Sequence, residues 1–244
     1  MNHTDLTRHF KYVKKTSEYY EITLNIFKMI QTRHRVEALT YLLELLDAGI
    51  HYNEICQEIF RPLLYDIGHL WESGMISVAQ EHHFSANIQF LISNIYIHIT
   101  PALPHNGRML AACVSDEPHD IGLRMISDLF DFEGWDVLFL GGNMSKFHFL
   151  KEVRDFKPHI CCLSYTMDWN FLEVVDWIQT ARAAVNYKIE FIVGGYNIDN
   201  RADRFIEMDV KVYQGEIEPI LLAAKQFLQS QIELKGLETC RFPP

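Results

Sequence analysis

The feature that most constrains this chain is a change in its apolar pattern near residue 107. Beyond that point, short apolar runs alternate with stretches in which apolar residues recur every three or four positions. Such runs predict buried strands, and the longer period predicts helices. Because the strands lack in-and-out alternation, they predict a parallel sheet covered on both faces. Strands are expected at Arg108–Ser115, Asp136–Leu140, Ile160–Ser164, Glu190–Val193 and Val210–Tyr213, with helices near 120–132, 146–155, 170–184 and 216–229.

The first hundred residues have helical periodicity instead. Helices are expected over 16–31, 36–50 and 52–71, and a fourth from an N-cap at Ser77 to about Ile97. Short turns between them predict a four-helix bundle. Two prolines, an asparagine and a glycine after Thr100 indicate a domain boundary. The expected organisation is a flexible N-terminus over 1–15, a helical bundle over 16–100, a Rossmann-like five-stranded parallel α/β domain over 107–230 and a tail over 231–244.

Composition excludes several classes of protein. The formal net charge is −10 over 244 residues, which argues against direct, non-specific nucleic-acid binding, although Arg33, His34 and Arg35 form a local basic cluster. Five cysteines, three of them in expected strands, suit reduced thiols and a cytoplasmic location. No zinc-site spacing, P-loop, G-x-G-x-x-G or membrane-length apolar run is present.

A histidine follows the first expected strand, in Glu117-Pro118-His119-Asp120-Ile121-Gly122. Open α/β sheets bind ligands at the carboxyl ends of their strands. The Glu117 carboxylate can hold one ring nitrogen of His119 and leave the other for a metal. Gly122 would let a bulky group approach the backbone. Taken alone, a histidine after a strand is more often an ordinary loop residue.

Two other strand ends extend this pattern, with Leu163-Ser164-Tyr165-Thr166 after the third strand and Gly194-Gly195 after the fourth. Together with Glu117-x-His119-x-x-Gly122, they resemble the cobalamin-binding domain shared by methionine synthase, corrinoid methyltransfer proteins and some mutases. The resemblance implies that His119 is the lower cobalt ligand, in place of the cofactor's own base, and that Glu117 is its partner. It also implies that the displaced nucleotide tail lies beside Ser164, Thr166, Gly194 and Gly195.

The helical part narrows the resemblance. Nine residues separate Trp71 from Glu81-His82, a spacing similar to that of the light-sensing adenosylcobalamin regulators of the CarH type. The resemblance implies that the bundle caps the upper face of cobalamin, with Trp71 over the adenosyl group and Glu81 and His82 in contact with it. An indole would exclude water, and a carboxylate would accept hydrogen bonds from ribose hydroxyls. By itself, Trp71 is more simply a core tryptophan.

Two departures from that family matter. Only some 30 residues precede the second helix, too few for the family's N-terminal winged helix-turn-helix domain, so direct DNA binding is not expected. The residue after Trp71, a histidine in the photosensors, is Glu72 here. This removes the family's route to a photoproduct with two histidine ligands, unless His82 or His83 takes that part.

Three functional hypotheses fit these features. The first is a light-responsive, non-enzymatic signalling protein that binds adenosylcobalamin and acts through a protein partner, such as a transcription factor, or through self-association into a homo-oligomer. The second is a corrinoid carrier in a methyltransferase system, with methylcobalamin as the cofactor. The third is the same fold repurposed for another tetrapyrrole, a haem or a bilin. Cys161-Cys162 would matter only for a bilin and is otherwise core filling.

Overall fold

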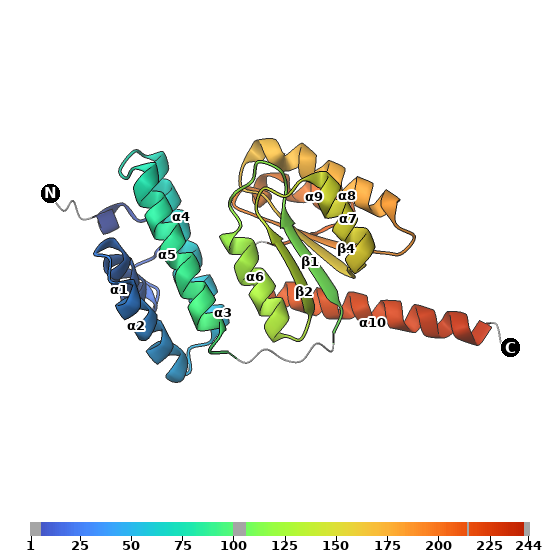
Figure 1. Cartoon of the computed structure of the whole chain (residues 1–244), viewed down its shortest axis with the longest axis horizontal. Helices are drawn as coiled ribbons and strands as arrows, with labels where there is room; N and C mark the ends of the chain where they lie inside the picture. Colours follow the sequence, from blue (N-terminus) through green and yellow to red (C-terminus); the bar gives the residue numbers. More distant parts are fainter. Residues whose placement is uncertain (1–5, 100–105, 214, 242–244) are drawn as a thin grey trace. The chain divides into compact units, whose positions relative to one another are not determined.

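The structure, a computed structural model, describes residues 6–99, 106–213 and 215–241 (Figure 1). It divides into two compact units, Met1–Thr100 and Pro101–Pro244. Each unit has its own buried core. Within the described ranges, no helix combines the length and apolar character needed to cross a bilayer.

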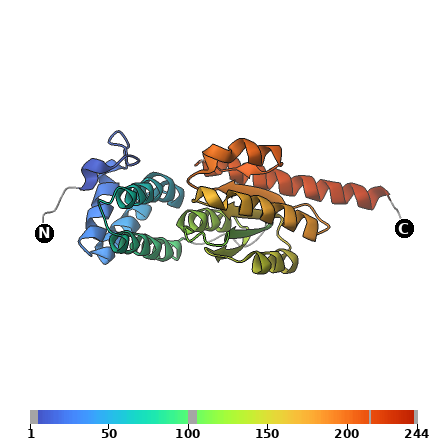
Figure 2. The same ribbon diagram turned by 90° about the horizontal axis from the view of Figure 1, so that it is seen from above.

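The first unit is built from helices α1 (Tyr20–Gln31), α2 (Arg35–Asp47), α4 (Arg61–Glu72) and α5 (Val78–Tyr96), which lie beside one another (Figures 1 and 2). Ser77 caps α5 as expected, because its hydroxyl accepts from the Gln80 N–H while the Gln80 side chain accepts from the Ser77 N–H. Apolar side chains from these helices fill the core, among them Ile26, Ile30, Leu42, Leu63, Leu70 and Ile88. The predicted helical bundle is confirmed.

The expected helix over 52–71 contains a π-helical turn. α3 (Tyr52–Glu54) runs through η2 (Ile55–Phe60) into α4, and the Arg61 N–H donates to the Cys56 carbonyl, five residues back. Pro62 has no N–H to donate within the helix, so the ordinary hydrogen-bond ladder is interrupted at this point. The π turn widens the helix there without ending it.

The described part of the segment before α1, which begins at Leu6, makes defined contacts with the bundle. A flexible N-terminus was expected over 1–15, of which residues 1–5 lie outside the described residues. Leu6–His9 forms a 3-10 turn, η1. The buried Asp66 carboxylate on α4 accepts hydrogen bonds from the backbone N–H groups of Lys11, Tyr12 and Val13, with N–O distances of 2.6 to 3.2 Å. One carboxylate therefore ties this segment to the bundle, and nothing in the local sequence of residues 1–15 reveals that partner.

The second unit is a five-stranded parallel sheet in the order β2-β1-β3-β4-β5. Helices α6 and α10 cover one face, and α7, α8 and α9 cover the other (Figure 1). The predicted fold class, a helical bundle followed by a Rossmann-like α/β domain, is confirmed. The strands are β1 (Arg108–Cys113), β2 (Asp136–Gly141), β3 (Ile160–Ser164), β4 (Glu190–Gly194) and β5 (Lys211–Val212), and the helices are α6 (Ile121–Phe132), α7 (Lys146–Phe156), α8 (Phe171–Ala184), α9 (Ala202–Glu207) and α10 (Ile217–Arg241).

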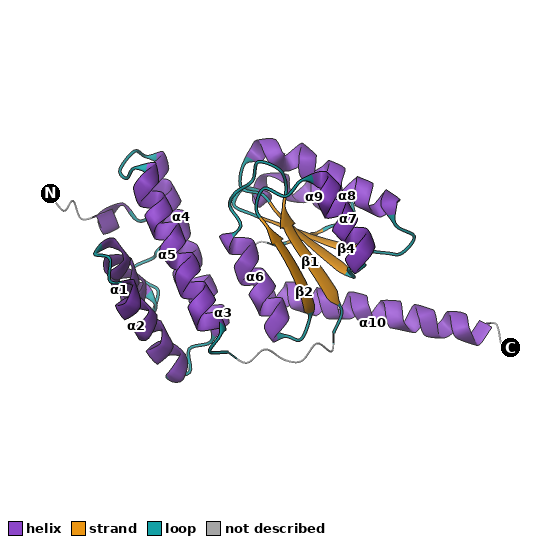
Figure 3. Ribbon diagram, in the orientation of Figure 1, coloured by secondary structure: helices purple, strands orange, loops and turns teal. Residues whose placement is uncertain are grey.

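The strand order reverses between β1 and β3. From β1 the chain crosses to β2 on one side, and from β2 it returns to β3 on the other side of β1. This reversal is the topological switch point of the sheet, and open α/β sheets bind ligands at the carboxyl ends of the strands beside such a point. The strands and the loops that follow them are drawn in orange and teal in Figure 3. The sequence motif around His119 lies in the loop after β1, at this switch point.

Three short elements of the second unit were not predicted: η3 (Asp168–Asn170), η4 (Ile198–Arg201) and α9. In addition, α10 continues to Arg241, so the predicted tail over 231–244 is helical as far as that residue. These elements are too short, or too weakly periodic, to stand out in an apolar pattern.

Candidate functional site

Glu117 and His119 form a hydrogen-bonded pair in the loop between β1 and α6. The His119 side chain is 47% exposed, whereas the Glu117 side chain is 0% exposed, and 2.5 Å separates Nδ1 of the imidazole from Oε1 of the carboxylate. His119 also donates its backbone N–H to the same oxygen at 3.3 Å. The carboxylate therefore orients both the ring and the backbone of His119.

The second carboxylate oxygen is held by the loop after β3. Oε2 of Glu117 accepts the backbone N–H of Thr166 at 2.6 Å, that of Met167 at 3.1 Å and the side-chain amide of Asn170 at 3.1 Å. Burial alone would raise the pKa of Glu117, but the hydrogen bonds from His119, Thr166, Met167 and Asn170 outweigh it and lower the pKa to about 2. Glu117 is therefore an anion at neutral pH.

The charge of Glu117 determines the tautomer of His119. An ionised carboxylate has no proton to donate, so Nδ1 must carry the hydrogen in the Glu117–His119 bond. In a neutral imidazole, the opposite nitrogen, Nε2, then has the lone pair that a metal ion requires. A carboxylate that fixes the tautomer of a partly exposed histidine is the arrangement needed in a histidine that binds a metal.

The loop after β2 also contacts this motif. The backbone N–H of Asn143 donates to the carbonyl of Glu117 at 3.0 Å, and that of Gly142 donates to Oδ2 of Asp120 at 3.1 Å. A Cβ on Gly142 would lie 3.0 Å from the Glu117 carbonyl oxygen, so this position favours glycine. Three strand-end loops thus meet at Glu117.

The remaining α/β residues singled out in the sequence lie at the same edge. Ser164 ends β3 and pairs in register with Cys113 on β1 and with Gly194 on β4. A Cβ on Gly194 would lie 3.3 Å from Cδ1 of Tyr213, so the Tyr213 ring packs directly over this glycine. Gly195 has φ +132, and a Cβ there would lie 1.8 Å from the Tyr165 carbonyl oxygen.

Gly122 differs from these glycines. It is exposed in the first turn of α6, and a Cβ on it would meet nothing within 4 Å. Its φ is not in the left-handed region. Neither packing nor backbone conformation within the described protein therefore requires a glycine at this position.

Trp71, Glu81 and His82 belong to the helical unit. Trp71, near the end of α4, is 41% exposed, so it is not a core tryptophan. The Glu81 carboxylate accepts from the Ser85 hydroxyl at 2.5 Å and lies 3.6 Å from His82 Nε2, and His82 is exposed. His83 instead contacts the Ile30 carbonyl at 3.1 Å, within the unit. The structure thus brings Glu81 and His82 together and leaves the Trp71 indole accessible.

Sequence reasoning missed the groups that hold Glu117. Met167, Asn170 and Asn143 come from two other loops, and the hydrogen-bonding side chain of Asn170 is more than fifty residues from Glu117 along the chain. In the sequence, Asn170 stands at the start of the helix expected over 170–184, a position that is typical of an N-cap residue. Its contact with a buried carboxylate is visible only in the folded chain.

The cysteines of the sheet are core residues. Cys113, Cys161 and Cys162 are free and buried, and burial raises the pKa of each thiol. Buried neutral thiols of this kind are inert. Their placement agrees with the simpler interpretation of Cys161-Cys162 as core filling.

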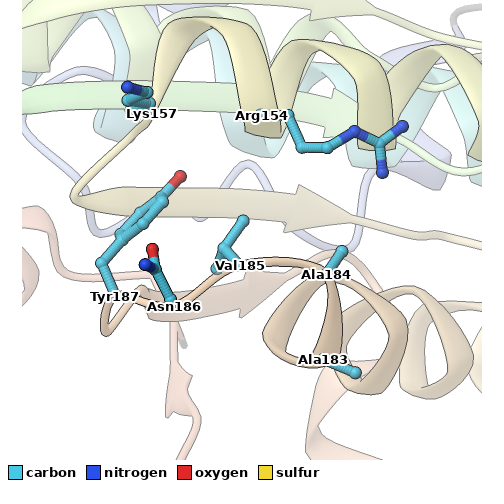
Figure 4. A pocket seen from close by; sticks show the side chains of 7 residues that line it. All are labelled: Arg154, Lys157, Ala183, Ala184, Val185, Asn186 and Tyr187. Atoms are coloured by element: carbon cyan, nitrogen blue, oxygen red, sulfur yellow. The ribbon is translucent and has the colours of Figure 1, made fainter.

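A hollow of about 450 Å³ lies at the opposite edge of the sheet (Figure 4). Arg154 and Lys157 line it from the end of α7, and Asn186 and Tyr187 from the connection that leads into β4. Basic residues at a helix C-terminus complement its dipole, which accounts for both cations without a ligand. Its lining residues precede β3 and β4 in the chain, so the hollow lies at the amino ends of these strands. The site around His119 lies at the carboxyl ends, and the hollow is not part of it.

Two family profiles match the chain, and both are described as B12 binding domains. One matches residues 107–224 and the other residues 26–95, so together they match most of the chain. Similar curated proteins are the HTH-type transcriptional repressors CarH and CarA of Myxococcus xanthus. CarH is 28% identical over 159 residues, covering 65% of this chain and 52% of its own length. CarA is 29% identical over 110 residues, covering 45% of this chain and 36% of its own length.

Among solved structures, the chain is similar to the monomethylamine corrinoid protein of Methanosarcina barkeri. The TM-score is 0.69 at 15% identity, covering 88% of this chain and 99% of the other, which is a likeness of fold. The chain spans about half the length of CarH and less of CarA. The two profile matches show that the chain carries B12 binding domains, one match lying in the helical unit and the other in the α/β unit.

Proposed function

We propose that this protein is a light-responsive regulator that binds adenosylcobalamin, with His119 as the lower cobalt ligand. The observation that supports the ligand assignment best is the Glu117–His119 pair, in which a buried anion fixes Nδ1 as the protonated nitrogen. Gly122, which has open space where a Cβ would be, would let the flat macrocycle approach the first turn of α6. Ser164, Thr166, Gly194 and Gly195 are the proposed contacts of the nucleotide tail.

The helical unit is proposed as the cap over the upper ligand. Trp71 leaves an apolar ring accessible, and two apolar residues that follow it in the chain are exposed as well, Met75 at 41% and Val78 at 52%. Apolar side chains left accessible near a helix turn are suited to covering an apolar or aromatic ligand face. The Glu81 carboxylate and His82 imidazole supply hydrogen-bonding groups on the first turn of α5. These residues would exclude water and orient the adenosyl group.

Adenosylcobalamin supplies a cobalt–carbon bond that light breaks. The protein would convert loss of the adenosyl group into a change of cap position, because Trp71, Glu81 and His82 would lose their ligand. The output would be a contact with a protein partner, such as a transcription factor, or a change in self-association. The likeness to CarH supports a regulatory role, because that relative is a transcriptional repressor.

Absorbance and elution volume, recorded in the dark and after green light, test this proposal. The protein should retain adenosylcobalamin in the dark, and light should change the spectrum, with a change in elution volume as well if the output is self-association. An unchanged spectrum together with an unchanged elution volume after illumination would contradict the light-responsive role. Failure to bind any cobalamin would contradict the proposed cofactor, and a haem or bilin spectrum in the purified protein would identify the third alternative.

A corrinoid carrier is the second candidate function. The fold likeness to the monomethylamine corrinoid protein extends over 99% of that chain. In this case the cap would protect a methyl group and move aside for transfer. Methylcobalamin retained in preference to adenosylcobalamin, together with methyl transfer from a methyl donor to the protein-bound cob(I)alamin that a reductive activator generates, would favour the carrier over the photoreceptor.

A further inference from the structure

Strand β2 is an edge strand, and within the described part of the chain no strand lies on its outer side. Successive residues of a strand direct their N–H and C=O groups to opposite sides. The Asp136 N–H donates to the Gly107 carbonyl at 3.0 Å, so Asp136 and Leu138 direct their backbone groups toward β1. Val137 and Phe139 therefore direct theirs outward, and these groups have no hydrogen-bond partner among the described residues.

This edge lacks the features that usually prevent strand addition. Natural sheets protect an edge with charged side chains, prolines or bulges. In β2, the four consecutive residues from Val137 to Leu140 are apolar, and all are only partly buried. The bulge in β2 comes after Phe139, where the register with β1 shifts between Ala111 and Ala112. The segment before the bulge is therefore open to pairing with a further strand.

The outer edge of β2 is complementary to a second copy of itself. In an antiparallel pair centred on Leu138, Val137 lies opposite Phe139 of the second copy, and the two residues exchange both of their backbone hydrogen bonds. An aromatic residue opposite a β-branched one is a favourable cross-strand pair. Leu138 meets its own counterpart on the other face, and each Asp136 lies opposite a Leu140. All outward backbone groups are thus satisfied, and no like charges face each other.

Helix α6 has charges that suit the same arrangement. The Arg124 guanidinium lies 5.7 Å from the centroid of the Phe139 ring, so this side of α6 faces the edge strand. Asp128 and Asp131 follow Arg124 at the spacing of one helix face. Because α6 contacts β1 as well as β2, its axis lies inward of the edge, which leaves room for a second α6 at about 10 Å. An antiparallel copy would place the basic end of one helix near the acidic end of the other.

We propose that the chain forms a symmetric homodimer in which β2 pairs antiparallel with β2 of a second copy and joins two five-stranded sheets into one. The two-fold axis passes beside Leu138, so each copy contributes the same surface. The dimer does not depend on the proposed cofactor, because none of these residues is among the proposed cobalamin contacts. It is therefore expected in the full chain in the dark, with or without cobalamin.

Sedimentation velocity over a range of concentrations measures the dissociation constant of the dimer. Val137→Pro removes an outward N–H and leaves the hydrogen bonds between β1 and β2 in place. Each dimer loses two of its four backbone hydrogen bonds, so the dissociation constant should rise about 30-fold. Val212→Pro, on the opposite edge strand β5, is the matched control. Because the Tyr213 N–H donates to the Val193 carbonyl, Val212 also directs its N–H outward, and this variant should leave the dissociation constant unchanged.

A disulfide tests the register of the pair. Residues opposite each other at a non-hydrogen-bonded position have Cα atoms about 4.5 Å apart, which a disulfide can span. Leu138→Cys should therefore form an intermolecular disulfide on mild oxidation, whereas Val137→Cys, which lies opposite Phe139, should not. Both variants also carry Cys240→Ser, because the four other cysteines are buried. Non-reducing electrophoresis measures the cross-linked fraction.

Three results would overturn the proposed dimer. A monomeric wild type would leave the β2 edge to water or to a strand of a different protein. Equal effects of Val137→Pro and Val212→Pro would place any dimer interface elsewhere. Cross-linking of Val137→Cys as readily as Leu138→Cys would contradict the register. Circular dichroism checks that each variant is folded, and if Val137→Pro does not fold, the cross-linking result decides.

Discussion

Glu117 acts at the site through both its side chain and its backbone. Its carboxylate orients His119 and accepts three donors from the β3–α8 loop, while its carbonyl accepts the Asn143 N–H of the loop after β2. Because each donor replaces a water that the buried anion has lost, the charge can be maintained inside the protein. The carboxyl edge of the sheet is thus assembled around one ionised residue.

The two glycines at the end of β4, Gly194 and Gly195, are expected to differ in how well they tolerate a side chain. Gly195→Ala combines φ +132 with a Cβ 1.8 Å from the Tyr165 carbonyl oxygen, so the backbone must move; the expected loss in the free energy of unfolding is about 3 kcal/mol or more. Gly194→Ala meets the Tyr213 side chain at 3.3 Å, which can shift, so the loss should be about 1 kcal/mol. Urea unfolding measures both. Equal losses would contradict these contacts.

The Glu117–His119 pair could be predicted from the sequence because the two residues are only two positions apart in one strand-end loop. The sequence could not predict that Asn170 and Met167 complete the carboxylate's hydrogen bonds, because those contacts depend on how two loops fold against each other. The resemblance to cobalamin-binding domains implied that Gly194 and Gly195 lie beside the nucleotide tail of the cofactor. The structure gives both glycines a packing reason as well, in Tyr213 and Tyr165.

At the scale of elements, strands were predicted to within about two residues because their apolar runs are bounded by glycines and polar turns. Helix α2 was predicted less well. The helix expected over 36–50 begins at Val36, yet Val36 is 63% exposed, while Ala38 and Leu42 form the fully buried face of α2. Alanine adds little to an apolar pattern, so the periodicity of the larger side chains pointed to a neighbouring face. Packing against α1 and α5 decides which face is buried.

Asp66 gives a prediction for the segment before α1. Asp66→Asn turns an acceptor-only carboxylate into an amide whose NH₂ group competes with the three N–H donors of Lys11, Tyr12 and Val13. The expected loss in the free energy of unfolding is about 2 kcal/mol, with faster trypsin cleavage after Lys11, Lys14 and Lys15. Asp47→Asn, at an exposed position at the end of α2, is the control. Unchanged cleavage would show that Asp66 does not hold this segment.

A second element-scale prediction concerns alkaline pH. The Tyr19 hydroxyl donates to the Glu54 carboxylate, and that bond, followed by burial, raises the pKa of Tyr19 to about 12. Because the folded pKa exceeds the unfolded value of about 10, the stabilisation is complete below pH 10 and is lost as the pH rises through 12. It amounts to roughly 2 kcal/mol. The difference in unfolding free energy between wild type and Tyr19→Phe should shrink over that range; a constant difference would refute the assignment.

At the scale of the whole molecule, the two units bring different chemistry. The α/β unit offers a histidine whose tautomer is fixed by a buried anion, and the helical unit offers an accessible indole on α4 and hydrogen-bonding groups on α5. The profile matches show that both units belong to B12 binding domains. The adenosyl group as upper ligand, and the movement of the cap when that group is lost, are proposals that rest on the helical unit.

Trp71 tests the proposed role of the helical unit. Because its side chain is 41% exposed, Trp71→Ala should lower the free energy of unfolding by only about 1 kcal/mol, yet shorten the retention of adenosylcobalamin in the dark. Val36→Ala, at an exposed apolar position on α2 of the same unit, should leave retention unchanged. Urea unfolding and dark dissociation kinetics measure the two effects. A loss of about 3 kcal/mol with unchanged retention would mark Trp71 as a structural residue.

Ligation of cobalt by His119 is tested most directly by the electron paramagnetic resonance spectrum of cob(II)alamin bound to protein in which histidine is labelled with ¹⁵N. If His119 is the lower ligand, each cobalt line should be split into a doublet by the labelled nitrogen rather than into the triplet given by ¹⁴N, and the doublet should disappear in His119→Ala. A triplet that survives the labelling would come from the cofactor's own base, and would contradict ligation by His119.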